Sequence, residues 1–229
     1  MTMWRVAVVV PAHNEAELLP GCLEAITLAS THPEVLGAVT RIVVVADACG
    51  DATAAVARGA GAQVVEVAHR KVGAARAAGV EAARDSGATW IATTDADSRV
   101  PADWLAQQRR YAMAGADVVV GTVSVASWSE WPETLPAVYD RSYSDGLSGG
   151  SHRHVHGANL GLRLGAYDAV GGFPAIGVAE DVALVAAAHD AGLTVVRPTT
   201  IAVQTSARRR ARAHGGFARH LADLERTIM

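Results

Sequence analysis

The stretch "ATWIATTDADSRV", residues 88–100, contains the pattern on which the fold prediction rests. Its first part predicts a short apolar strand, and Asp95 and Asp97 follow with only Ala96 between them. Two carboxylates this close repel each other and gain little from folding, so their position suggests a third, bound group. We expect Pro101 at the first position of the next helix, where its missing N–H costs nothing. The two acids are therefore expected on a strand-to-helix loop.

Short β-branched runs alternate with alanine-rich segments through the first half of the chain. Such continuous apolar strands between helices indicate an α/β fold with a mostly parallel central sheet and helices on both faces. The expected strands are 5–10, 41–46, 63–67, 89–94 and 117–123, and the expected helices are 15–29, 51–60, 72–86 and the segment after Pro101.

The second half is less regular. Residues 124–154 show no clear period, and we interpret them as a mobile or extended connection between two halves of one domain. After them we expect a strand over 155–163, a helix over 180–191, a short strand near 193–197 and a basic carboxyl-terminal segment.

The composition limits the classes of function. The chain has 229 residues, half of them apolar, with a formal net charge of −3. It therefore lacks an overall positive field for nucleic acid. Cys22 and Cys49 are too few for a disulfide framework, and we expect free thiols in a reducing compartment. No segment reaches the roughly 18 apolar residues of a membrane span, so a cytoplasmic protein is expected, with peripheral membrane contact left open.

Acids follow three of the predicted strands. Glu15 ends "PAHNE", Asp47 lies in "ADACGD", and Asp95 and Asp97 lie in "TTDADS". In a doubly wound sheet these loops face one crevice. Such a crevice repels phosphates unless a divalent cation intervenes, and carboxylates without nearby cysteine suit Mg²⁺ or Mn²⁺. The alternative is that Asp95 and Asp97 merely cap the next helix and pair with Arg99.

Other nucleotide sites are not supported. No G-x-G-x-x-G follows the first strand, and no G-x-x-x-x-G-K-[ST] occurs in the chain. Phosphate binding would instead depend on the metal and on scattered basic residues.

Seven stretches along the chain carry a family pattern when taken together. In order they are "VVVPAHNEAELLPGCLEAI", "IVVVADACGDAT", "VGAARAAGVEAA", "DAD", "VPADWL", "GANLGLRLGAYDAVGGFP" and "AEDVAL". In these stretches the chain resembles family 2 glycosyltransferases of the GT-A fold, over nearly its whole length. This resemblance implies one GT-A-like domain over 1–229, with a nucleotide-sugar-binding half at about 1–122 and a smaller acceptor-binding half at about 123–229.

The resemblance also implies roles for individual residues. Asp97 would be the main metal ligand, with Asp95 beside it contacting the sugar or ribose, and Asp47 would contact the base or ribose. Asp181 would be the catalytic base, supported by Glu180. The remaining nucleotide-sugar-binding candidates are Pro11, Ala12, Asn14, Glu15, Lys71, Arg76 and Ala96, of which Lys71 and Arg76 could reach the donor phosphates.

Each of these assignments has a simpler alternative. Glu180 and Asp181 could be helix-start acids favoured by the helix dipole, and Lys71 and Arg76 could lie on a solvated helix face. The chain also departs from the family pattern, because Ala46 precedes Asp47 where two acids are common. The Gln-x-x-Arg-Trp motif of processive synthases is missing, which argues against a polymerising enzyme.

The second half contains further candidates. The resemblance implies that Arg208 and Arg212, from the run "ARRRARA", lie in a late segment that closes over the diphosphate. The alternative is a solvated charge run. His156, Gly157 and Asn159 are expected to bind the acceptor. His152, His154 and His156 alternate, so a strand would place them on one face, where zinc binding is a weaker alternative. Trp128, Trp131 and Tyr139 could stack on a sugar or lipid or pack in the core.

These features predict a metal-dependent, inverting glycosyltransferase that moves one sugar from a UDP- or GDP-sugar to an acceptor hydroxyl. A retaining transferase of the same fold and a non-catalytic nucleotide-sugar-binding protein are the alternatives. Nucleic acid is not an expected partner, and a homodimer is left open.

Overall fold

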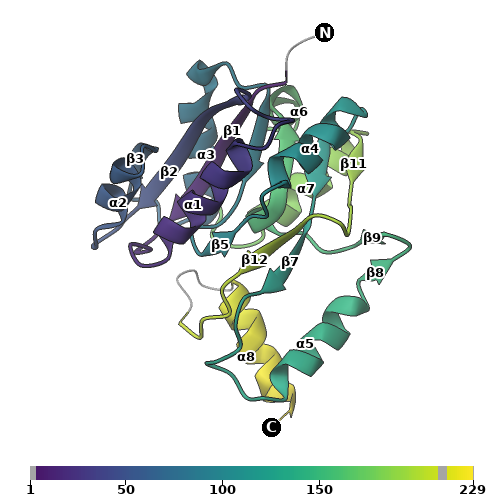
Figure 1. Cartoon of the computed structure of the whole chain (residues 1–229). Coiled ribbons are helices and arrows are strands. Elements are labelled where there is room, and N and C mark those ends of the chain that lie inside the picture. The colour runs from purple at the N-terminus through teal and green to yellow at the C-terminus, as the bar shows by residue number, and fades with distance from the viewer. Residues whose placement is uncertain (1–3, 211–215, 229) are drawn as a thin grey trace.

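The computed structural model describes residues 4–210 and 216–228. Within these residues, seven strands form a large sheet in the order β11-β6-β10-β4-β1-β2-β3 (Figure 1). Its members are β1 (Val6–Ala12), β2 (Val39–Asp47), β3 (Gln63–Val67), β4 (Trp90–Thr93), β6 (Val118–Val120), β10 (Leu160–Arg163) and β11 (Val195–Val196). Only β10 runs antiparallel to its neighbours, so the expectation of a mostly parallel sheet is confirmed.

Helices cover both faces of this sheet (Figure 1). Strand β1 alternates its buried side chains between the two faces, so that Val8 packs with one set of helices and Val9 with the other. The first face holds α1 (Leu19–Ser30), α2 (Thr53–Gly59) and α4 (Trp104–Met113), and the second holds α3 (Val72–Ala83), α6 (Leu164–Ala169) and α7 (Glu180–Asp190). Both faces are therefore apolar, which explains the continuous apolar strands.

A smaller layer lies beyond one end of the large sheet. It comprises the three-stranded sheet β5-β12-β7, the β8-β9 hairpin and the helices α5 and α8. Helices α5 and α8 lie side by side at the bottom of Figure 1. The bounds are β5 (Ser98–Arg99), β7 (Thr122–Val125), β8 (Leu147–Ser148), β9 (Ser151–His152), β12 (Ala202–Thr205), α5 (Leu135–Ser144) and α8 (Phe217–Ile228). Trp131, Leu135 and Leu221 form the core between α5 and α8.

Several sequence-based boundaries were wrong. Residues 124–154 are not a mobile or extended connection, because the β8-β9 hairpin and α5 form there and α5 packs against α8. Pro101 does not begin a helix. Its carbonyl accepts the N–H of Trp104 in a turn, and α4 begins only at Trp104.

Two other elements differ in extent. Helix α1 begins at Leu19 rather than Glu15, because the Glu15 carbonyl closes a turn with the N–H groups of Leu18 and Leu19. The strand expected over 155–163 begins only at Leu160, after a 3₁₀ turn (Gly157–Asn159). Cys22 and Cys49 are free thiols, as expected.

None of the helices in the described ranges is both long and apolar enough to span a bilayer.

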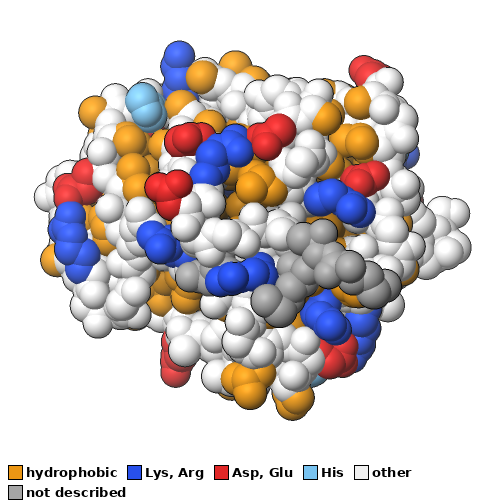
Figure 2. All heavy atoms as spheres, turned by 90° about the horizontal axis from the view of Figure 1, so that it is seen from above, with side chains coloured by type: hydrophobic (Ala, Val, Ile, Leu, Met, Phe, Trp, Pro, Cys, Tyr) orange, Lys and Arg blue, Asp and Glu red, His pale blue; other side chains and the backbone are white. Residues whose placement is uncertain are grey.

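On the face shown in Figure 2, acidic and basic side chains lie next to one another among apolar ones. This face therefore has no broad region of a single charge, in agreement with the small net charge.

Candidate active site

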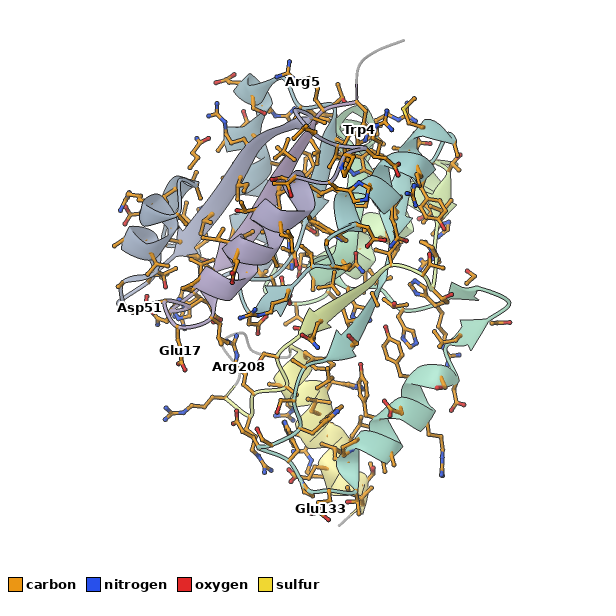
Figure 3. The ribbon with its side chains drawn as sticks, in the orientation of Figure 1. Trp4, Arg5, Glu17, Asp51, Glu133 and Arg208 are labelled. Atoms are coloured by element: carbon orange, nitrogen blue, oxygen red, sulfur yellow. The ribbon has the colours of Figure 1, made fainter. Side chains whose placement is uncertain are left out.

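The parallel strands β1, β2 and β4 are neighbours, so the loops that follow them meet at one edge of the large sheet. In Figure 3 this edge is marked by three labelled residues: Glu17 from the loop after β1, Asp51 from the loop after β2, and Arg208. A cavity of about 1240 Å³ opens here. The predicted site residues that line it are Pro11, Ala12, Glu15, Asp47, Lys71, Arg76, Asp95, Ala96, Asp97, His156, Gly157, Glu180, Asp181 and Arg208.

Asp47 organises the loop that enters α3. Its carboxylate accepts the backbone N–H groups of His69 at 2.7 Å, Arg70 at 2.9 Å and Lys71 at 3.2 Å. Arg70 adopts a positive φ of 53°, a strained conformation that these hydrogen bonds help to hold. Asp47 lines the cavity, but most of its hydrogen-bonding capacity serves this loop.

Asn14 lies outside the set of described residues that line the cavity. Its Oδ1 accepts the N–H of Gly50 at 2.7 Å, which ties the loop after β1 to the loop after β2. The backbone N–H of Glu15 donates to Thr53 Oγ1 at 2.8 Å and adds a second tie. The structure thus gives Asn14 a role in holding the two loops together.

Asp95 pairs with a buried arginine. The Arg76 side chain is only 3% exposed and donates to Asp95 Oδ1 at 2.6 Å and to the buried carboxylate of Glu180. Arg76 therefore lies at the base of the cavity, between the acids that follow β4 and those that begin α7. It was expected to reach donor phosphates from a helix face.

Asp97 pairs with Arg208, whose Nη2 lies 3.1 Å from its Oδ2. Burial raises the pKa of Asp97 to about 6, and the charge of Arg208 opposes that rise. The simpler alternative expected Asp95 and Asp97 to pair with Arg99 and to cap the next helix. They pair instead with Arg76 and Arg208, and the N-cap of α4 is Asp103.

The donor atoms fit a hard divalent cation held jointly with a ligand. Asp95 and Asp97 present carboxylate oxygens to the same cavity, and Mg²⁺ commonly takes one or two protein carboxylates and completes its shell with water and phosphate oxygens. In the part of the chain that the structure describes, no group of three or more His, Cys, Asp or Glu side chains is arranged to hold a metal alone. The zinc alternative for the alternating histidines therefore has no support among these residues.

Asp181 lies in the first turn of α7. Its Oδ2 accepts the N–H of Gly157 at 2.6 Å and its Oδ1 accepts the N–H of Val182 at 2.8 Å. These two bonds fix the carboxylate at the cavity wall, in a segment other than the one that holds Asp95 and Asp97. Glu180 is 3% exposed and paired with Arg76.

The acceptor candidates separate into two kinds. His156 lines the cavity and its Nε2 lies 3.0 Å from the Tyr143 hydroxyl. Asn159 is 1% exposed and is not among the described residues that line the cavity. Its side chain bonds Trp104 Nε1 at 2.9 Å and the carbonyls of Thr122 and Ile201 at 2.7 and 3.0 Å. Asn159 thus joins the large sheet to the small one.

The alternating histidines share a face, as expected. The rings of His152, His154 and His156 follow one another at centroid distances of 6.0 Å. Burial lowers the pKa of His156 to about 3, so this imidazole is neutral near pH 7. The imidazoles of His152 and His154 bond to backbone carbonyls at 2.9 and 2.8 Å.

The arginine run divides. Arg208 enters the cavity, whereas Arg209 stacks on Trp131 at 4.5 Å and pairs with Glu225. Arg212 lies outside the described residues. Of the three aromatic candidates, Tyr139 lines the cavity and Trp128 and Trp131 pack between α5 and α8.

Other cavity residues were missed. They include His13, Arg70, Tyr143, Ile176, Val178, Phe217 and His220. Most come from segments without a readable period, and only their tertiary placement brings them to the cavity.

The fold is that of the GT-A glycosyltransferases. S. aureus TarS (residues 1–349, in complex with UDP-GlcNAc) superposes with a TM-score of 0.68 and 15% identity, over 98% of this chain and 65% of that one. The mannosyltransferase PcManGT of Pyrobaculum calidifontis, in complex with GDP-Man and Mn²⁺, superposes with a TM-score of 0.68 and 21% identity. That superposition covers 92% of this chain and 59% of the mannosyltransferase. At these identities the likeness concerns the fold alone.

The sequence matches the family described as Glycosyl transferase family 2 over residues 7–171, and the chain belongs to that family. A search of curated proteins found no match. The chain thus spans 65% of the length of TarS 1–349 and 59% of the length of the mannosyltransferase.

Proposed function

We propose that this chain is a metal-dependent glycosyltransferase that moves one sugar from a nucleotide-diphosphate sugar to an acceptor hydroxyl, with inversion. The observation that carries the proposal is the placement of Asp95 and Asp97 after β4 and of Asp181 at the start of α7 around one cavity. Family membership and the UDP-GlcNAc and GDP-Man complexes of the similar structures support a UDP- or GDP-sugar donor.

In this proposal Asp97 and Asp95 hold the cation, Mg²⁺ or Mn²⁺, which when bound neutralises the charge of the leaving diphosphate. Asp181 takes the acceptor proton while the acceptor oxygen bonds to the anomeric carbon and the bond from that carbon to the diphosphate oxygen breaks. The electron pair of the broken bond leaves with the diphosphate. The bonds from Gly157 and Val182 keep the Asp181 carboxylate oriented for this transfer.

The test compares Asp181→Asn with Asp190→Asn, a change at the exposed far end of the same helix. With a general base removed, we expect turnover to fall by about 10²-fold or more while donor affinity is kept. The Asp190 variant should match the wild type. Normal turnover of Asp181→Asn would end the assignment of the base.

NMR of the anomeric proton of the product separates inversion from retention. An anomeric configuration opposite to that of the donor supports the proposal, and an unchanged configuration makes the enzyme a retaining transferase. Tight donor binding without release of nucleoside diphosphate across a panel of acceptors would instead indicate a non-catalytic binding protein.

A further inference from the structure

The two ends of the cavity differ in chemistry. At the strand edge its walls are formed by charged side chains, chiefly those of Glu15, Arg76, Asp97 and Arg208. The other walls come from the small sheet, from α5 and α8, from the segment after β9 and from the loop before α7. They carry the apolar or aromatic side chains of Val123, Tyr139, Tyr143, Val155, Ile176, Val178 and Phe217, and polar side chains such as Ser142, Thr205 and His220 lie among them.

In the cavity wall around Tyr143, the side chains of Tyr143, His154 and His156 already form hydrogen bonds within the protein. The Tyr143 hydroxyl accepts the N–H of Val123 at 3.1 Å and is bonded to His156, and the imidazole of His154 is bonded to the Tyr143 carbonyl. His154 also covers a face of the Tyr143 ring, at a centroid distance of 3.8 Å. The part of the wall around Tyr143 therefore offers few free hydrogen-bond partners to a ligand with hydroxyls on every side, and the Tyr139 hydroxyl, which has no partner among the described residues, is the exception.

The loop before α7 places two aliphatic side chains in the cavity while leaving them open to solvent. Ile176 is 41% exposed and Val178 is 45% exposed, and both line the cavity that contains Asp181. The loop is held in place, since the Ile176 carbonyl accepts the N–H of Gly73 in α3 at 3.0 Å. Exposed aliphatic surface in a fixed position beside a binding site is a ready contact for an apolar ligand.

We infer that the acceptor is an alcohol with an apolar body, whose hydroxyl faces Asp181 while its body packs against Ile176 and Val178. The inference rests on the proposed function and names its acceptor class. Ile176 and Val178 then determine specificity, because a polar glycan would leave both of them in contact with water. Two such side chains are too few to anchor a bilayer, so the alcohol is taken from solution.

The test uses alcohols with identical hydroxyls and a growing apolar body. Methyl, butyl and hexyl β-D-glucoside are titrated calorimetrically into enzyme saturated with Mn²⁺ and with UDP or GDP, whichever it binds. Since each buried methylene tightens binding by about fourfold, we expect the Kd to fall at least about 10-fold from methyl to hexyl. The double variant Ile176→Ser/Val178→Ser should lose this dependence, and the control Leu28→Ser/Leu36→Ser, exposed and outside the cavity lining, should keep it.

The outcomes separate this inference from the proposed function. Intact nucleotide binding with no glucoside binding, or with the same Kd for methyl and hexyl glucoside, would overturn the inference alone. The same dependence in the Ile176/Val178 double variant would also overturn it. Absence of any UDP or GDP binding would overturn the proposed function itself. Sedimentation with phosphatidylcholine vesicles tests whether the acceptor alcohol comes from solution or from a membrane. We expect the protein not to co-sediment with the vesicles. Co-sedimentation of the wild type that the Ile176/Val178 double variant loses would overturn uptake from solution.

Discussion

Arg208 and Glu15 lie 193 residues apart in the sequence, yet the Arg208 guanidinium donates two hydrogen bonds to the Glu15 carboxylate, at 2.7 and 2.6 Å. The same guanidinium lies 3.1 Å from Asp97. It thus provides a fixed positive charge beside the carboxylates that are proposed to hold the cation. A bidentate arginine pair is well oriented and only partly screened by solvent.

Replacing Arg208 should therefore affect metal and donor binding in opposite directions. In Arg208→Ala we expect Mn²⁺ alone to bind about 10-fold more tightly, because a repelling charge is removed from the neighbourhood of Asp97. The donor should bind about 10-fold more weakly, because a partner for its phosphates is lost. Calorimetry of both ligands, with Arg209→Ala as control, tests this. An unchanged Mn²⁺ affinity would contradict it.

Arg76 should be essential for stability. Arg76→Met leaves the buried carboxylate of Glu180 without its partner, and breaking a buried pair in this way costs about 3–5 kcal/mol. The control Arg84→Met removes pairs with the exposed Asp168 and Glu81, which should cost at most about 1 kcal/mol. Urea unfolding measures both. Equal stability of the two variants would show that the Arg76 pair contributes nothing.

Asn159 should act on stability and not on the acceptor. Asn159→Ala removes the bonds to Trp104, Thr122 and Ile201, so we expect the free energy of unfolding to fall by about 2–3 kcal/mol. Donor affinity of the folded variant should match that of the wild type. A stable Asn159→Ala protein with a raised KM for acceptor would instead restore the acceptor role expected from the sequence.

His156 should make stability depend on pH. Its folded-state pKa of about 3 lies below the unfolded value of 6.5, because burial disfavours the charged imidazole. The unfolded chain therefore takes up a proton as the pH falls below 6.5 while the folded chain does not, and stability decreases towards acid pH. Between pH 7.5 and pH 5 this contribution is at most about 2 kcal/mol.

The comparison of wild type with His156→Gln isolates that contribution. Burial also lowers the pKa values of His152 and His220, so the wild type loses stability from all three imidazoles. The variant should lose less stability than the wild type over the same pH interval, as measured by urea midpoints. Parallel pH profiles would mean that His156 is not the neutral group described.

The sequence predicted the large sheet and its acidic edge because both depend on local signals. The apolar strands β1, β2 and β4 have buried side chains on both faces, and the acids that follow them are fixed by topology once the strands run parallel. The free thiols of Cys22 and Cys49 were predicted from their number.

The ionic partners could not be predicted in the same way. Arg76 lies in an alanine-rich helix, where it has the same local sequence signal as a solvated residue, and only the packing of α3 against α7 buries it beside Glu180. Helix α5 was missed although Leu135, Tyr139 and Tyr143 recur at helical spacing, because these three residues are few and lie in a segment that is otherwise polar and contains two prolines. Asn159 was assigned to the acceptor site because proximity in sequence to Gly157 was taken for proximity to the cavity.

The most direct measurement of the central claim is a calorimetric titration of UDP- and GDP-sugars with Mn²⁺, with Mg²⁺ and with chelator. It is made on the wild type and on Asp97→Ala, whose carboxylate faces the cavity. We predict that one nucleotide class binds, that chelator weakens its binding, and that Asp97→Ala loses the metal dependence. If no donor binds, or if binding ignores both the metal and Asp97, the two acids after β4 serve structure alone and the proposed function fails.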